Sequence, residues 1–247
     1  MDAWLIAIVA LGAAAAGFVQ GLAGFGFGLV SMAFWSWSLA PALAVPLVVF
    51  GSLLGQLLAV RSLRQSFCLR RALPFLAAGV LGIPVGVWLL RYVEPDMFKL
   101  GVGLVLVVYC PAMLFAARLP RISAGGRGAD AVVGWVGGVM SGFGGLPAPA
   151  PTLWCTLRGW TKDAQRAVFQ SFNLLMHAVT MAVYFASGLV TGEALRLFAV
   201  AGPAMLVPTL AGIWLYGRFS DAAFRRLVLA LLAASGAVLV VGGLRAA

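Results

Sequence analysis

Residues 17–31 read GFVQGLAGFGFGLVS, a run in which five glycines interrupt an otherwise apolar stretch. A second glycine-rich stretch, GGVMSGFGGLPAPAP, occupies residues 137–151. Within the two stretches, Ala23-Gly24-Phe25-Gly26 aligns with Ser141-Gly142-Phe143-Gly144. Hydrophobic segments that are broken by glycine at matching places in two halves of a chain are typical of the binding site of a membrane transporter.

The composition predicts an all-α polytopic membrane protein. Of the 247 residues, 63% are hydrophobic and only 10% are charged, whereas about 25% are charged in a typical soluble protein. The apolar runs are continuous rather than alternating, which excludes a β-barrel. The net charge is +10, but the basic residues form short clusters between apolar runs. This is the pattern of cytoplasmic loops, so we expect no nucleic-acid partner. The three cysteines show no metal-ligand spacing, and we expect no metal or cofactor.

Ten apolar segments can be separated at charged residues or at proline and glycine. They run over about 3–22, 24–40, 42–60, 72–91, 98–117, 131–146, 148–157, 165–187, 195–216 and 223–243. Most approach the roughly 20 residues that a spanning helix needs, but 131–146 and 148–157 are shorter. We therefore predict eight to ten transmembrane helices with two glycine-broken hairpins, which either span or re-enter the membrane.

The charges of the loops predict the orientation of the chain. The loops after the third, fifth, seventh and ninth segments are rich in arginine, which places them in the cytoplasm. The loops over 91–99 and 188–196 are balanced in charge and are expected outside. With ten segments, both termini are then also outside.

A second repeated pattern supports a division into two halves. Gly86-Val-Trp88-Leu89 followed by Phe98-Lys99 matches Gly212-Ile-Trp214-Leu215 followed by Phe224-Arg225. We predict a first repeat over 1–118, a cytoplasmic linker over 119–129 and a second repeat over 130–247. Because each half has five segments, an odd number, the two halves have opposite topology. Such inverted repeats are a known basis of alternating access.

The polar residues predict that the substrate is an anion. No Asp or Glu lies within an apolar segment, which argues against cation transport. The N–H groups at the glycine breaks and the neutral polar side chains can donate hydrogen bonds to an anion. The only histidine, His177, is a candidate for proton coupling. The candidate substrate-binding residues are Gln20, Gly21, Gly24, Gly26, Ser52, Gln56, Ser141, Gly142, Gly144, Gln170, Asn173 and His177.

Other interpretations of the same residues remain open. The Gly17xxxGly21 and Gly138xxxGly142 spacings also suit simple helix packing, and the amides also suit interhelical hydrogen bonds. Ser141-Gly142 with His177 is similar to an intramembrane serine protease pair, but Val139 stands where such a hydrolase has glycine. We therefore do not expect an enzyme. A passive anion channel and a non-transporting scaffold are the remaining alternatives.

The chain resembles the TauE/SafE family of sulfite and organosulfonate exporter-like permeases. The resemblance rests on GFVQGLAGFGFGLVS, on its repeat GWVGGVMSGFGG and on the downstream RAVFQSFNLLMHAVT, and it covers essentially the whole chain. The second copy departs from the commoner family pattern in the Leu-Pro-Ala-Pro-Ala-Pro that follows its glycines. The resemblance implies a multi-pass protein of a bacterial inner membrane. It also implies export or exchange of a small anion, such as sulfite, sulfoacetate, a taurine-like sulfonate or a carboxylate.

Overall fold

The computed structural model describes residues 3–23, 26–60, 69–115, 121–122, 125–215 and 221–246. Within these ranges the chain forms ten α-helices and no strand, which confirms the predicted all-α class. The helices are α1 (Ala3–Ala23), α2 (Phe27–Trp35), α3 (Pro41–Val60), α4 (Leu69–Tyr92), α5 (Pro95–Leu114), α6 (Gly126–Gly144), α7 (Pro149–Leu157), α8 (Lys162–Ala186), α9 (Gly192–Leu215) and α10 (Asp221–Ala246).

Six of these helices are long and apolar enough to cross a membrane, namely α1, α3, α4, α5, α8 and α9. Helix α10 contains a shorter apolar stretch, Val228–Leu244. Helices α2 and α7 have nine residues each and are therefore about 14 Å long. Each covers less than half of a hydrocarbon core of about 30 Å, so neither can cross it alone. The chain is a multi-pass membrane protein.

Two of the expected segments differ from the helices that form. The expected segment 24–40 gives only the short helix α2, because a turn over 36–40 intervenes before Pro41 begins α3. The expected segment 131–146 gives a longer helix, because α6 begins at Gly126 and includes the charged Arg127 and Asp130. Hydropathy excludes these charged residues from an apolar segment although the backbone is helical. In both halves, a long helix is therefore followed by a short one.

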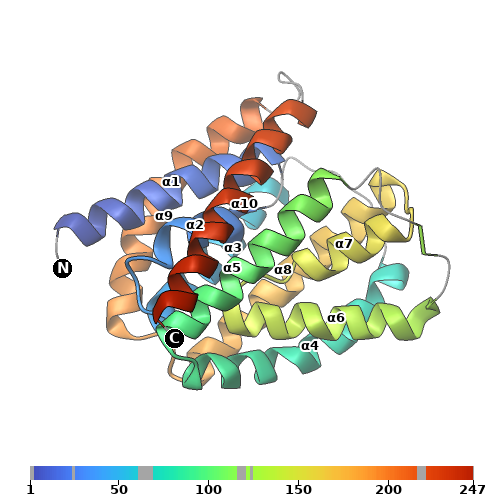
Figure 1. Ribbon diagram of the computed structural model, residues 1–247, viewed down its shortest axis with the longest axis horizontal. Coiled ribbons are helices and arrows are strands. Elements are labelled where there is room, and N and C mark those ends of the chain that lie inside the picture. The colour runs from blue at the N-terminus through green and yellow to red at the C-terminus, as the bar shows by residue number, and fades with distance from the viewer. Residues whose placement is uncertain are drawn as a thin grey trace.

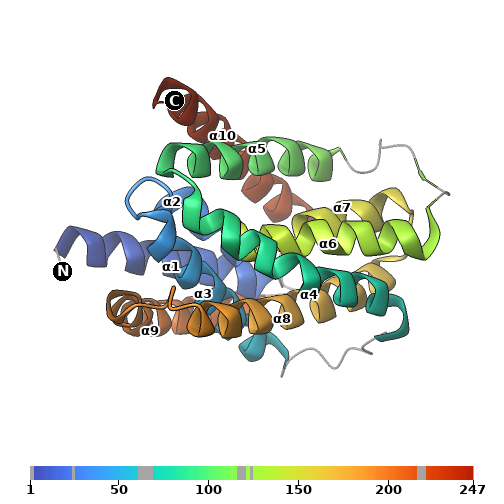
Figure 2. The ribbon, with the colours of Figure 1, turned by 90° about the horizontal axis from the view of Figure 1, so that it is seen from below.

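The helices pack in pairs that join the first half of the chain to the second. Helix α1 packs against α9, α4 against α6, α5 against α10, and α3 against α8. Figure 1 shows α1 beside α9 and α4 beside α6. Figure 2 shows α5 and α10 along one side of the molecule, with α8 and α9 on the opposite side.

Glycines allow two of these pairs to approach closely. A Cβ at Gly21 on α1 would overlap the carbonyl oxygen of Thr209 on α9. A Cβ at Gly142 on α6 would likewise overlap the carbonyl oxygen of Ile83 on α4. Small residues bring helix backbones into direct contact in this way inside membranes. Both glycines therefore fix the positions of the long helices that precede α2 and α7.

Candidate functional site

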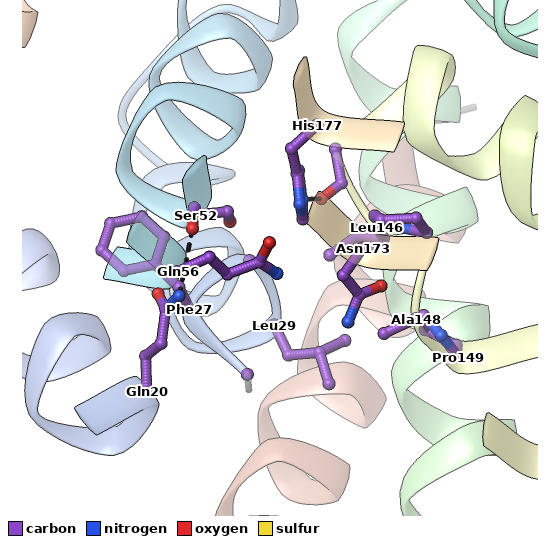
Figure 3. Close-up of a pocket in the computed structure, with 14 residues that line it drawn as sticks. Gln20, Phe27, Leu29, Ser52, Gln56, Leu146, Ala148, Pro149, Asn173 and His177 are labelled. Carbon is purple, nitrogen blue, oxygen red and sulfur yellow. Dashed lines mark hydrogen bonds between the residues drawn. The ribbon is translucent and has the colours of Figure 1, made fainter. Parts of the chain in front are cut away.

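A small cavity lies where the two short helices meet α3 and α8 (Figure 3). Its volume is about 30 Å³, which is room for about two water molecules. It is lined by Gln20, Gly26, Phe27, Gly28, Leu29, Ser52, Gln56, Gly145, Leu146, Pro147, Ala148, Pro149, Asn173 and His177. Both glycine breaks and the polar faces of α3 and α8 therefore meet at one place.

The N-terminus of α2 forms one wall of the cavity. Gly26 precedes the helix with a φ of 101°, a left-handed conformation that glycine adopts without strain. The first helical hydrogen bond runs from the N–H of Val30 to the carbonyl of Gly26, at 3.0 Å. The N–H groups of Phe27, Gly28 and Leu29 precede that bond and have no carbonyl partner within the helix. Together with the helix dipole, they make this wall a donor surface for an anion.

The N-terminus of α7 forms a different wall. Gly145, with a φ of 66°, ends α6, and the chain passes through Leu146 to Pro147, Ala148 and Pro149 along the cavity. The two prolines have no N–H group, so Ala148 is the only one of these last three residues that could donate from its backbone. The N–H donors that the sequence predicts at both breaks are therefore concentrated at α2.

Two carboxamides face the cavity from opposite sides. Gln56 extends from α3 towards Asn173 on α8, as Figure 3 shows. Gln56 is 8% exposed and Asn173 is 2% exposed. Their carbonyl oxygens, Oε1 and Oδ1, have no hydrogen-bond partner among the residues that the structure describes. Buried amides are usually paired, so this arrangement is typical of a ligand site.

The remaining polar side chains at the cavity are anchored by main-chain carbonyls. Gln20 donates from Nε2 to the carbonyl of Ser52, at 3.0 Å. The Nε2 atom of His177 lies 3.3 Å from the carbonyl oxygen of Gly145. A carbonyl oxygen can only accept, so the hydrogen of a neutral His177 ring lies on Nε2. Its Nδ1 is then an acceptor, and it has no partner among the described residues.

The cavity is electrically neutral apart from the helix dipoles. Among the described residues that line it there is no Asp, Glu, Lys or Arg, and His177 is the one histidine. An anion here would be held by hydrogen bonds and by the positive end of α2 rather than by a side-chain cation.

The predicted site residues divide into two groups. Gln20, Gly26, Ser52, Gln56, Asn173 and His177 line the cavity. Gly21 and Gly142 lie at the helix contacts described above, and Ser141 forms a hydrogen bond of 2.8 Å with Thr180. Gly144 and Gln170 are not among the residues that line the cavity. Gly24 lies outside the described residues.

The candidate residues did not include several that line the cavity. Phe27, Gly28 and Leu29 belong to it because they form the first turn of α2. A signal for them exists in the sequence, since the first residues after a glycine break carry the free N–H groups of the next helix. The sequence gives no such signal for Leu146, because an apolar residue within an apolar stretch cannot be distinguished from its neighbours.

Comparisons with curated proteins and with solved structures give no match. The sequence profile of a family described as "Sulfite exporter TauE/SafE" matches residues 9–239, which include every residue that lines the cavity. The match confirms the resemblance seen in the two glycine-rich stretches. The chain belongs to the sulfite exporter TauE/SafE family, whose members are membrane transporters and not enzymes.

Proposed function

We propose that this protein is a secondary transporter that exports or exchanges a small anion by alternating access. The observation that carries the proposal is the donor-rich first turn of α2. It lies in a neutral cavity beside the carboxamides of Gln56 and Asn173, whose carbonyl oxygens have no partner among the described residues. Sulfite, an organosulfonate or a carboxylate has oxygens that could accept hydrogen bonds from these groups. The proposed binding residues are those six predicted residues that line the cavity, together with the first turn of α2.

The proposed mechanism uses the two halves, 1–118 and 130–247, as inverted repeats. In this scheme α1 is equivalent to α6, α4 to α9 and α5 to α10. The packing supports it, because the contact of α1 with α9 has its equivalent in the contact of α6 with α4, and α5 packs against α10. It is also supported by the cavity, which lies between equivalent elements of the two halves, α2 with α3 and α7 with α8. Movement of one part against the other would open the cavity alternately to the two sides of a bacterial inner membrane.

Proton coupling through His177 is the second part of the mechanism that we propose. Its Nδ1 has no hydrogen-bond partner among the described residues and is the ring atom that would take up a proton. A proton on Nδ1 would give the cavity a positive charge when the anion is bound. Anion and proton would then move together.

A passive anion channel would use the same groups but would need an open path. The small volume of the cavity, about 30 Å³, supports a carrier instead. Counterflow separates the two mechanisms, because unlabelled anion on the far side accelerates a carrier and leaves a channel unaffected.

The test is flux of labelled sulfite into proteoliposomes, with and without unlabelled sulfite inside. We expect acceleration by internal sulfite in the wild type and a loss of at least about tenfold in Asn173→Leu and Gln56→Leu, because each removes a buried hydrogen-bonding group. Thr209→Val is the control, since Thr209 is also buried, its hydroxyl has no partner among the described residues, and it does not line the cavity. Wild-type flux in both leucine variants would contradict the proposed site, and conductance without acceleration would favour the channel.

A further inference from the structure

The cavity contains more acceptors than an all-acceptor anion could use. Four buried atoms of its lining residues lack a partner among the residues that the structure describes: Gln20 Oε1, Gln56 Oε1, Asn173 Oδ1 and His177 Nδ1. All four can accept a hydrogen bond. A ligand whose outer atoms are only acceptors would leave such atoms unpaired, and each unpaired buried polar atom weakens binding.

For two of these side chains, a hydrogen bond to a main-chain carbonyl fixes which end of the side chain is the free acceptor. Gln20 has its Nε2 on the carbonyl of Ser52, so its oxygen is the free end. His177 has its Nε2 on the carbonyl of Gly145, so its Nδ1 is the free end of a neutral ring. The amides of Gln56 and Asn173 can rotate, and each can present either an oxygen or an NH₂ group to a ligand.

The charge of the cavity limits the charge of its ligand. No Lys or Arg is among the described residues that line it, and the positive group at its wall is the first turn of α2. A helix N-terminus is equivalent to roughly half a positive charge. A monovalent anion could be stabilised there, whereas a divalent anion would keep an excess of buried negative charge.

We infer that the site selects a monovalent anion that carries its own hydrogen-bond donor, such as a hydrogen oxyanion or a hydroxylated sulfonate or carboxylate. The inference rests on the proposed function and specifies its substrate class. The anionic group lies against the N–H groups of Phe27, Gly28 and Leu29. The O–H group of the ligand faces the acceptors of Gln56, Asn173 and His177 across the cavity.

The test uses three sulfonates whose charges do not change with pH in the neutral range. Isethionate, propane-1-sulfonate and ethane-1,2-disulfonate share a sulfonate on a two-carbon spacer and end in a hydroxyl, a methyl or a second sulfonate. The first two are nearly equal in size. The free-energy cost of enlarging the cavity is therefore the same for both and does not affect the ratio of their affinities. Binding to the purified wild-type protein is measured by calorimetry, and inhibition of sulfite counterflow is measured in proteoliposomes.

We expect isethionate to bind about tenfold more tightly than propane-1-sulfonate. The methyl group of propane-1-sulfonate leaves a buried acceptor without a donor, and the cost of one such unpaired acceptor corresponds to about a tenfold loss of affinity. The disulfonate should bind most weakly. In Asn173→Leu the ratio of the first two affinities should fall towards one, and in Thr209→Val it should stay at the wild-type value. Because the first comparison uses only the wild-type protein, it does not depend on whether a variant folds.

Each contrary result has a distinct meaning. Equal or tighter binding of propane-1-sulfonate would overturn this inference and leave anion transport intact. Sulfite counterflow that none of the three sulfonates inhibits would also overturn the inference alone. The absence of sulfite counterflow in the wild-type protein, with no binding of any sulfonate, would overturn the proposed function itself.

Discussion

Single residues show what the sequence can and cannot separate. A glycine that lets two helices touch and a glycine that lets a ligand approach have the same spacing in the sequence. Gly26 lines the cavity, whereas Gly21 and Gly142 lie against carbonyl oxygens of neighbouring helices. The polar face of α8 was predictable from the spacing of Asn173 and His177. Gln170 shares that face but lies about 4.5 Å further along the helix axis than Asn173, beyond the cavity lining.

The helix contact at Gly142 leads to a prediction about stability. Gly142→Ala should lower the free energy of unfolding by about 1–3 kcal/mol, because the new methyl group would push α6 away from the Ile83 carbonyl on α4. Gly128→Ala is the matched control on the same helix, since nothing lies within 4 Å of a Cβ at that position. It should be neutral or stabilising by up to about 1 kcal/mol. Thermal unfolding of both variants in the same detergent measures the difference, and equal melting temperatures would contradict the packing role of Gly142.

At the scale of elements, the two short helices are related in position but differ in chemistry. The breaks themselves were predictable from the glycines, and the prolines after the second break were visible in the sequence. The exact first residue of each short helix could not be predicted, because the ends of a helix are less well defined by the sequence than its middle. That one residue decides which N–H groups remain free. Pro149 begins α7 and lines the cavity, while Pro151 lies in the same turn and does not line it.

This difference can be tested by restoring a donor to α7. Pro149→Ala adds one N–H group at the cavity, and it should raise the affinity for a monovalent anion by about tenfold, the scale of one charge-assisted hydrogen bond. Pro151→Ala makes the same chemical change in the same helix without adding a donor to the cavity lining. Its affinity should equal that of the wild type. Calorimetry with isethionate compares the three proteins, and an equal gain in both variants would show that helix flexibility rather than the donor is responsible.

The arrangement of the whole molecule agrees with the pattern of loop charges. Arg91, at the end of α4, donates from Nη2 to the carbonyl of Ser187, at the end of α8, over 2.6 Å. The two loops that were expected outside therefore lie together. Ile122, in the linker between the halves, donates from its N–H to the carbonyl of Leu157 at 2.8 Å, which joins two regions expected in the cytoplasm. The pairing of helices across the halves was not predictable in detail, because it depends on contacts between residues far apart in the chain.

These two groups of loops predict the topology of the chain in the membrane. In a protein without its native cysteines, we expect Glu94→Cys and Glu193→Cys to react with an impermeant maleimide added outside intact cells. Both positions are exposed at the start of helices that follow the balanced loops. Gly128→Cys, exposed at the start of α6, should react only after the cells are opened. Its reaction after opening is the control that the position is accessible. Labelling of all three positions from outside would contradict a membrane crossing by α5 and an odd number of crossings over α6–α8, and the reverse pattern would contradict the orientation given by the arginines.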